Sequence, residues 1–97
     1  MSDTGEVYAL LDRADELSTR DASVSGRMLL GLTVALMLAS GLAEEGPPPV
    51  GLELPGTLGE CIVAAADKVA RWDPSMMSMP AHELSMLMPD LVDELGR

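Results

Sequence analysis

The sequence predicts an all-α fold: a small four-helix bundle-like domain that uses residues 1–97 as one unit. Hydrophobic residues make up 47% of the chain and aromatic residues only 2%, so the core must consist of Leu, Met, Val and Ala, which favour helices. Apolar positions recur at intervals of three and four, which is the period of an amphipathic helix. A chain of 97 residues suits a single core.

The first predicted helix covers about residues 4–18. Asp3 and Glu6 have the spacing of a capping box, which favours a helix start at this point. The apolar residues that follow lie on one face, with acidic and basic residues on the other. This inner stripe consists of Val7, Leu10, Leu11, Ala14 and Leu17.

The second predicted helix, about residues 22–45, contains the longest uncharged stretch. Residues 28–43 are MLLGLTVALMLASGLA, and these sixteen positions would rise about 24 Å as a helix, whereas a hydrocarbon core is about 30 Å thick. We therefore expect a buried central helix, surrounded by the other three, and not a membrane span. Asp21 or Ser23 can cap its start.

Small residues recur on this second helix, and the segment after it is rich in proline. Gly31, Ala35 and Ala39 are four residues apart, so another helix can approach closely on that face. Residues 46–56, GPPPVGLELPG, are incompatible with a continued helix and predict an extended connector.

The third predicted helix covers about residues 58–72. Thr57 and Glu60 form a second capping box, while Asp73 and Pro74 end the helix and can begin a short turn. Its inner stripe consists of Leu58, Ile62, Ala65, Val69 and Trp72.

The last predicted helix covers about residues 80–95 and starts at a favourable proline, Pro80. Its apolar stripe continues through Pro89, so we expect either a kink or a break into two short helices. The stripe consists of Leu84, Leu87, Met88, Leu91 and Leu95.

Charge limits the possible partners. Sixteen acidic and six basic residues give a net charge of −10, which opposes direct binding to nucleic acid or to an anionic membrane. Cys61 is the only cysteine, so a disulfide framework is excluded and a reducing compartment is favoured. The first residues lack the basic start of a signal peptide, and we expect a cytoplasmic protein.

No motif predicts catalysis, a cofactor or a metal centre. The segment HELSM at 82–86 begins like a zinc-protease helix, but Met86 stands where the second histidine would be. Cys61 and His82 could form a nucleophile and base. Because Cys61 lies near an apolar stripe, we expect a buried structural cysteine instead.

Methionine is concentrated in residues 76–88, MMSMPAHELSMLM. Thioethers together with His82 could hold Cu(I), since soft ligands select that ion. Methionine is also frequent in irregular cores and on surfaces that bind partner helices or several targets. We favour a protein interface, composed of Met76, Met77, Met79, Leu84, Met86, Leu87, Met88, Leu91 and Leu95.

These observations predict a non-catalytic protein–protein interaction module, a small acidic adaptor or regulator that binds a protein partner or forms a homo-oligomer. The alternative is an acidic inhibitor or antitoxin-like protein, of the kind that phages encode, which blocks a nucleic-acid-handling protein by charge mimicry. The third hypothesis is a Cu(I)-binding, methionine-rich protein. The absence of Asn, Gln and Phe indicates G+C-rich codons, as in a high-GC bacterium or its phages.

Overall fold

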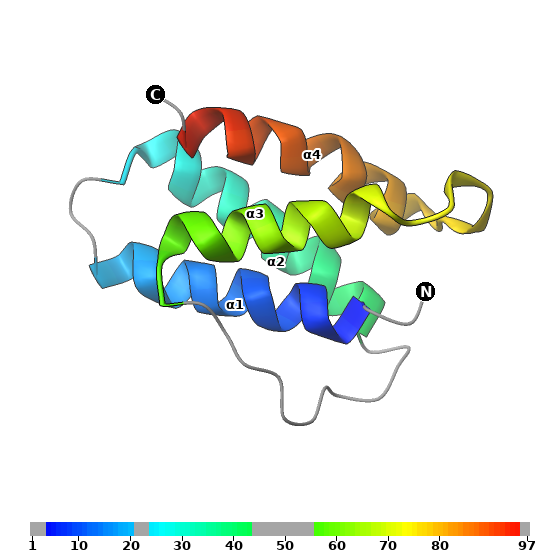
Figure 1. Cartoon of the computed structure of the whole chain (residues 1–97), viewed down its shortest axis with the longest axis horizontal. Helices are drawn as coiled ribbons and strands as arrows, with labels where there is room; N and C mark the ends of the chain where they lie inside the picture. Colours follow the sequence, from blue (N-terminus) through cyan, green and yellow to red (C-terminus); the bar gives the residue numbers. More distant parts are fainter. Residues whose placement is uncertain (1–3, 21–23, 44–55, 96–97) are drawn as a thin grey trace.

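Four α-helices pack side by side in the computed structural model of the chain (Figure 1). The structure describes residues 4–20, 24–43 and 56–95, and no strand occurs within these ranges. The predicted all-α four-helix architecture is therefore confirmed. The elements are α1 (Thr4–Arg20), α2 (Gly26–Ala43), α3 (Leu58–Ala70), the 3-10 turn η1 (Pro74–Met76) and α4 (Met79–Leu95).

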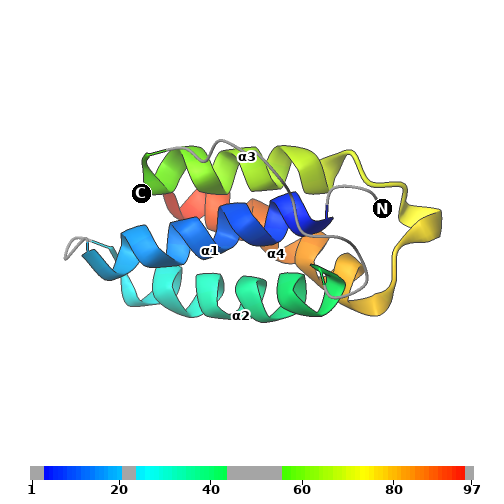
Figure 2. The same ribbon diagram turned by 90° about the horizontal axis from the view of Figure 1, so that it is seen from below.

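The helices occupy the four corners of a square. Helix α1 packs against α2 and α3, and α4 packs against the same two helices from the other side (Figure 2). In Figure 1, α1 and α4 run from right to left, whereas α2 and α3 run from left to right. Each pair of packed neighbours is therefore antiparallel, and α2 and α3 lie on a diagonal.

Helix α2 is not the buried centre of the fold, which corrects the sequence-based expectation. It occupies a corner, packs mainly against α1 and α4, and buries one stripe of side chains. In a four-helix square each helix turns only part of its circumference to the core, so an uncharged sequence does not require burial on all sides. The buried residues of α2 are Met28, Leu32, Ala35, Ala39 and Leu42.

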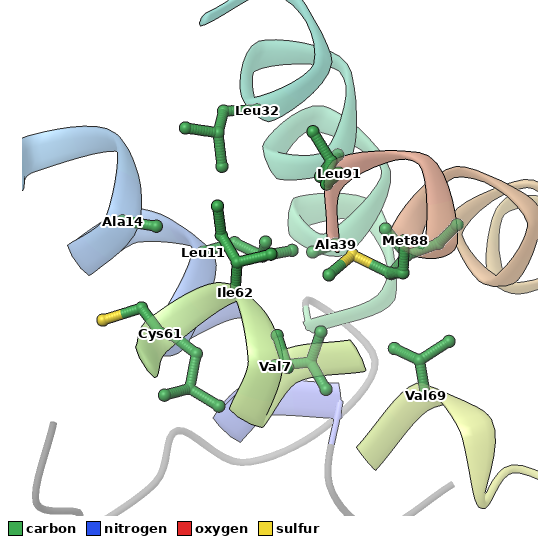
Figure 3. Close-up of a cluster of buried hydrophobic side chains, with 14 of the residues drawn as sticks. Val7, Leu11, Ala14, Leu32, Ala39, Cys61, Ile62, Val69, Met88 and Leu91 are labelled. Atoms are coloured by element: carbon green, nitrogen blue, oxygen red, sulfur yellow. The ribbon is translucent and has the colours of Figure 1, made fainter. Parts of the chain in front are cut away.

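The other helices bury the stripes that their periodicity predicts. Figure 3 shows Leu11, Ile62 and Met88, from three different helices, gathered at the centre of the bundle. Leu17 and Leu58, at the ends of their stripes, are half-buried. The fully enclosed large side chains are Val7, Leu11, Leu32, Cys61, Ile62, Val69, Leu84 and Met88.

Serine and threonine side chains define two helix starts. The Thr57 hydroxyl accepts the Glu60 N–H at 3.3 Å, so the predicted cap of α3 is confirmed. Helix α2 begins later than expected, because Ser25 caps it: the Ser25 hydroxyl accepts the Met28 N–H at 3.1 Å. The caps predicted at Asp3 and at Asp21 or Ser23 lie outside the described residues.

The predicted short turn after α3 is present as η1. The Asp73 carboxylate accepts the Ser75 N–H at 3.0 Å and the Ser75 hydroxyl at 2.9 Å, and Pro74 follows it at the first helical position. Both hydrogen bonds lower the pKa of Asp73, and the one from the backbone N–H of Ser75 has the larger effect.

Helix α4 is continuous through Pro89, so the predicted break into two short helices does not occur. Proline has no N–H, and the Ser85 carbonyl therefore lacks its usual partner four residues later. Pro89 is exposed, which keeps this interruption on the outer side of the bundle.

A close approach between α2 and α4 occurs at the small-residue face predicted in α2. A Cβ atom added to Gly31 would lie 2.6 Å from Cδ2 of Leu91, so only glycine leaves the Leu91 side chain in its present position. Ala35 and Ala39 are buried on the same helix.

Two further expectations concern the connector and a membrane span. The predicted connector 46–56 lies outside them except for Gly56. In the parts of the chain that the structure describes, no helix is long and apolar enough to cross a membrane.

Candidate functional site

The structure divides the predicted methionine–leucine interface between the core and the surface. Leu84, Met88 and Leu91 are at most 3% exposed, because they lie on the face of α4 that meets α2 and α3. This corrects their expected placement on an accessible surface. They hold the monomer together and cannot contact a partner without unfolding it.

The remaining members of that predicted set lie at or near the surface. Met79 and Met86 are 71% and 67% exposed on the outer side of α4. Met77, Leu87 and Leu95 are half-buried and pack against the core. The side chain of Met76 lies outside the described part of the structure.

The outer side of α2 also carries exposed apolar side chains. Leu30 and Met37 are 68% and 71% exposed, and Leu29 and Val34 are 38% and 43% exposed. No charged residue occurs between Arg27 and Ala43. We call this surface the α2 face, defined by Leu29, Leu30, Thr33, Val34, Met37 and Gly41.

The polar group and the glycine on the α2 face are both compatible with burial against a partner. The Thr33 hydroxyl donates to the Leu29 carbonyl at 2.9 Å, so its donor is already satisfied within the helix and its desolvation costs less than that of an unpaired hydroxyl. Among the described residues, apart from the adjacent residues and the backbone of the helix itself, no atom would lie within 4 Å of a Cβ on Gly41, so this position is open space on the α2 face.

The α2 face is the exposed apolar surface that sequence reasoning missed. The signal was present, since Leu30, Val34, Met37 and Gly41 follow the helical spacing of four, three and four. Because the opposite side of the helix is equally apolar, periodicity alone does not indicate which stripe is buried. Contiguous exposed apolar side chains of this kind are typical of interaction surfaces.

Cys61 and His82 do not form an accessible nucleophile–base pair. Cys61 is fully buried in α3, and this burial raises the pKa of its thiol. The Arg13 charge lowers this pKa by a smaller amount, and the Glu60 charge adds to the rise. The resulting neutral thiol is a poor nucleophile. His82 is exposed on α4.

Ion pairs join some of the acidic residues to the few bases. Lys68 on α3 contacts Glu6 on α1 at 2.7 Å and thus links two packed helices. Glu16 contacts both Arg13 at 3.5 Å and Arg20 at 3.0 Å along the outer side of α1. These pairs are partly or largely exposed, so each contributes little to stability.

A shallow groove of about 390 Å³ lies between α3 and α4. Val69 and Met88 contribute to its lining from the core, and Pro89 contributes from the outer side of α4. Its remaining lining residues are Ala66, Ala70, Ser85, Val92 and Asp93.

No family model, curated protein or solved structure matches the chain. No group of three or more His, Cys, Asp or Glu side chains suited to a metal ion occurs among the described residues. The α2 face carries four exposed large apolar side chains on one helix and is suited to binding another apolar surface.

Proposed function

We propose that the protein is a non-catalytic interaction domain that self-associates through the α2 face. The observation that supports this most directly is the run of exposed Leu30, Val34 and Met37 on a helix that carries no charge beyond Arg27. Burial of an apolar surface of this kind away from water is favourable.

A second copy of the chain is the partner that this surface fits best. If two α2 helices pair in antiparallel orientation about a two-fold axis between Val34 and Met37, each Val34 lies opposite Met37 of the other copy. In the same register, Leu30 lies opposite Gly41 of the other copy, where a side chain finds open space. A two-fold interface requires this self-complementarity.

The ends of the paired helices are also compatible with this register. Arg27, which is exposed near the start of α2, would approach the C-terminal end of α2 in the second copy. A cation near a helix C-terminus interacts favourably with the helix dipole and the terminal carbonyl groups.

The expected affinity is moderate. The exposed fractions of Leu29, Leu30, Val34 and Met37 amount to about two fully exposed apolar side chains per copy, and burial of each is worth about 1.5–3 kcal/mol. Two copies together gain about 6–12 kcal/mol, against an association cost of about 4–15 kcal/mol. The most favourable balance is about 8 kcal/mol, so we expect a reversible dimer of moderate affinity at most, with a Kd no lower than about 1 µM.

Salt distinguishes this proposal from charge mimicry. Each copy carries a net charge of −10, so the two copies repel each other at long range and added salt should strengthen the dimer. A complex in which the carboxylates mimic nucleic-acid phosphates on a basic protein should instead weaken steeply as salt rises.

The experiment is sedimentation equilibrium of the wild-type chain and two glutamate variants over a range of concentrations. Met37→Glu places a charge at the centre of the α2 face and should give a monomer. Met79→Glu is the matched control, because Met79 is also 71% exposed but lies on α4. Circular dichroism checks that helix content is unchanged in both.

The outcomes separate the two surfaces. A wild-type dimer that Met37→Glu dissociates and Met79→Glu leaves intact supports the α2 face. Dissociation by Met79→Glu alone would move the interface to the methionines of α4. A wild-type chain that stays monomeric at about 1 mM would contradict self-association, since the binding free energy would then be less than about 4 kcal/mol.

A further inference from the structure

The outer side of α4 holds a group of soft metal ligands that is independent of the α2 face. Met79, His82 and Met86 are three and four residues apart in one helix. With 3.6 residues per turn, the three positions fall within about 60° around the helix axis. All three residues are exposed.

We propose that Met79, His82 and Met86 bind a soft monovalent d¹⁰ metal ion, Cu(I) or Ag(I). Side chains at i and i+3 or i+4 on a helix are neighbours, with Cβ atoms about 5–6 Å apart. Along the helix, His82 therefore lies between Met79 and Met86, about one turn from each.

The freedom of the thioethers allows them to converge on one ion. Met79 and Met86 are 71% and 67% exposed, so core packing does not fix their side chains, and each has three rotatable bonds. Side chains on a helix lean toward its N-terminus, which brings Met86 toward His82. The helix backbone at His82 is ordered, with its N–H donating to the Ser78 carbonyl at 2.9 Å.

The ligand set selects the class of ion. Two thioethers and one imidazole are soft or intermediate ligands, which favour Cu(I) over Mg²⁺ or Ca²⁺. A structural zinc site would require four ligands of the Cys, His or carboxylate type, and no group of three such side chains suited to a metal ion occurs in the described ranges. The surrounding charge, −10 for the chain, raises the local concentration of any cation.

The core methionines provide an internal contrast. Met28 and Met88 are buried to within 4% of full enclosure and have no access to an ion in solution. Met37 is as exposed as Met79 but has no histidine in its helix. We therefore expect the metal ion to affect the exposed methionines beside His82, but neither the buried methionines nor Met37.

The test is a titration of the wild-type chain, labelled with ¹³C at the methionine methyl groups, with silver nitrate in chloride-free buffer. Ag(I) is used first because it does not undergo redox chemistry with the protein under these conditions. We expect the methyl signals of Met79 and Met86 and the ring signals of His82 to shift with one common midpoint. The signal of Met37 should not move at that midpoint.

Variants of the ligands and a matched control define the site. His82→Ala should weaken Ag(I) binding by about tenfold or more, and Met86→Leu, which keeps the size and apolar character of the side chain, should also weaken it. Met37→Leu should leave the midpoint unchanged. These positions are exposed, so circular dichroism should show the same helix content in all variants.

Two precautions keep the result independent of dimer formation and of the thiol. The titration is repeated with Leu30→Glu, which keeps Met37 exposed even if the wild-type chain dimerises. Because signals are assigned by residue, Ag(I) that reacts with Cys61 is distinguished from Ag(I) on α4. Shifts of Met79 and Met86 no larger than that of Met37, or an unchanged midpoint in His82→Ala, would overturn the proposal.

Discussion

Helices α1 and α2 occupy equivalent corners of the bundle but have opposite outer surfaces. Both bury a stripe of Leu and Ala against their neighbours. On the outer side of α1, exposed residues include Asp12, Glu16 and Arg20, and Glu16 forms ion pairs with two arginines. On the outer side of α2, the corresponding surface is the uncharged α2 face.

This difference shows that folding of the bundle requires an apolar inner stripe on each helix but does not determine the outer surface. The inner stripes of the four helices form the core. Helix α1 shows that a helix at a corner of the bundle can have a polar outer surface. The apolar outer surface of α2 is therefore not needed for packing among the four described helices. We propose that it serves self-association instead.

The largest effect on stability is expected from truncation of a buried leucine in the inner stripe of either α1 or α2. Leu11 in α1 and Leu32 in α2 are fully buried, so Leu11→Ala and Leu32→Ala should each lower the free energy of unfolding by about 2–5 kcal/mol. Urea denaturation in the monomeric Met37→Glu background measures this without a contribution from association. Leu30→Ala, only two residues away but exposed, should change the same quantity by less than about 0.5 kcal/mol.

A comparable loss of stability in Leu30→Ala would contradict this assignment. It would mean that the outer stripe of α2 packs within the monomer.

An intermediate effect is expected at Gly41, where stability and association should respond in opposite directions. Gly41→Ala should raise the free energy of unfolding of the monomer by about 0.5–1 kcal/mol, because alanine favours the helix and meets no atom within 4 Å. The same methyl group should weaken the dimer, since Leu30 of the second copy would lose the gap it occupies. Denaturation of the Met37→Glu background and sedimentation of the wild-type background measure the two effects separately.

A Gly41→Ala chain that dimerises as well as the wild type would show that the two copies do not meet in the proposed register.

The smallest effect is expected on the charged outer surface of α1. Glu16→Gln removes the carboxylate that contacts Arg13 and Arg20, and it should lower the free energy of unfolding by about 0.5 kcal/mol or less, because such exposed pairs are weak. The difference should disappear at about 1 M salt, where these charges are screened. A loss above about 1 kcal/mol would mean that the outer surface of α1 contributes to folding, and the contrast with α2 would be reduced.

Much of the fold was predictable from local signals. The inner stripes of α1 and α3 follow directly from their periodicity, because the charged residues of each helix lie outside its stripe and indicate the outer side. The cap at Thr57 and the turn at Asp73 and Pro74 are equally local. These features depend on residues within one or two turns of each other.

The site was less predictable because it depends on which of two apolar stripes faces the core. Helix α2 has no charged residue after Arg27 to mark its outer side, and the choice is made by contacts with α1 and α4. In α4, Met86 and Met88 are two residues apart and chemically identical, yet one is exposed and the other buried. The continuity of α4 through Pro89 likewise depends on packing of the stripe on both sides of the proline, which local propensity does not include.

The diagonal placement of α2 and α3 has a consequence for how the chain assembles. Helices α1 and α2 form one antiparallel hairpin and α3 and α4 form another, so the contacts within each half are close in sequence, which favours rapid formation. The contacts between the halves are those of α1 with α3 and of α2 with α4. In terms of assembly, the domain is a pair of helical hairpins carried on one chain.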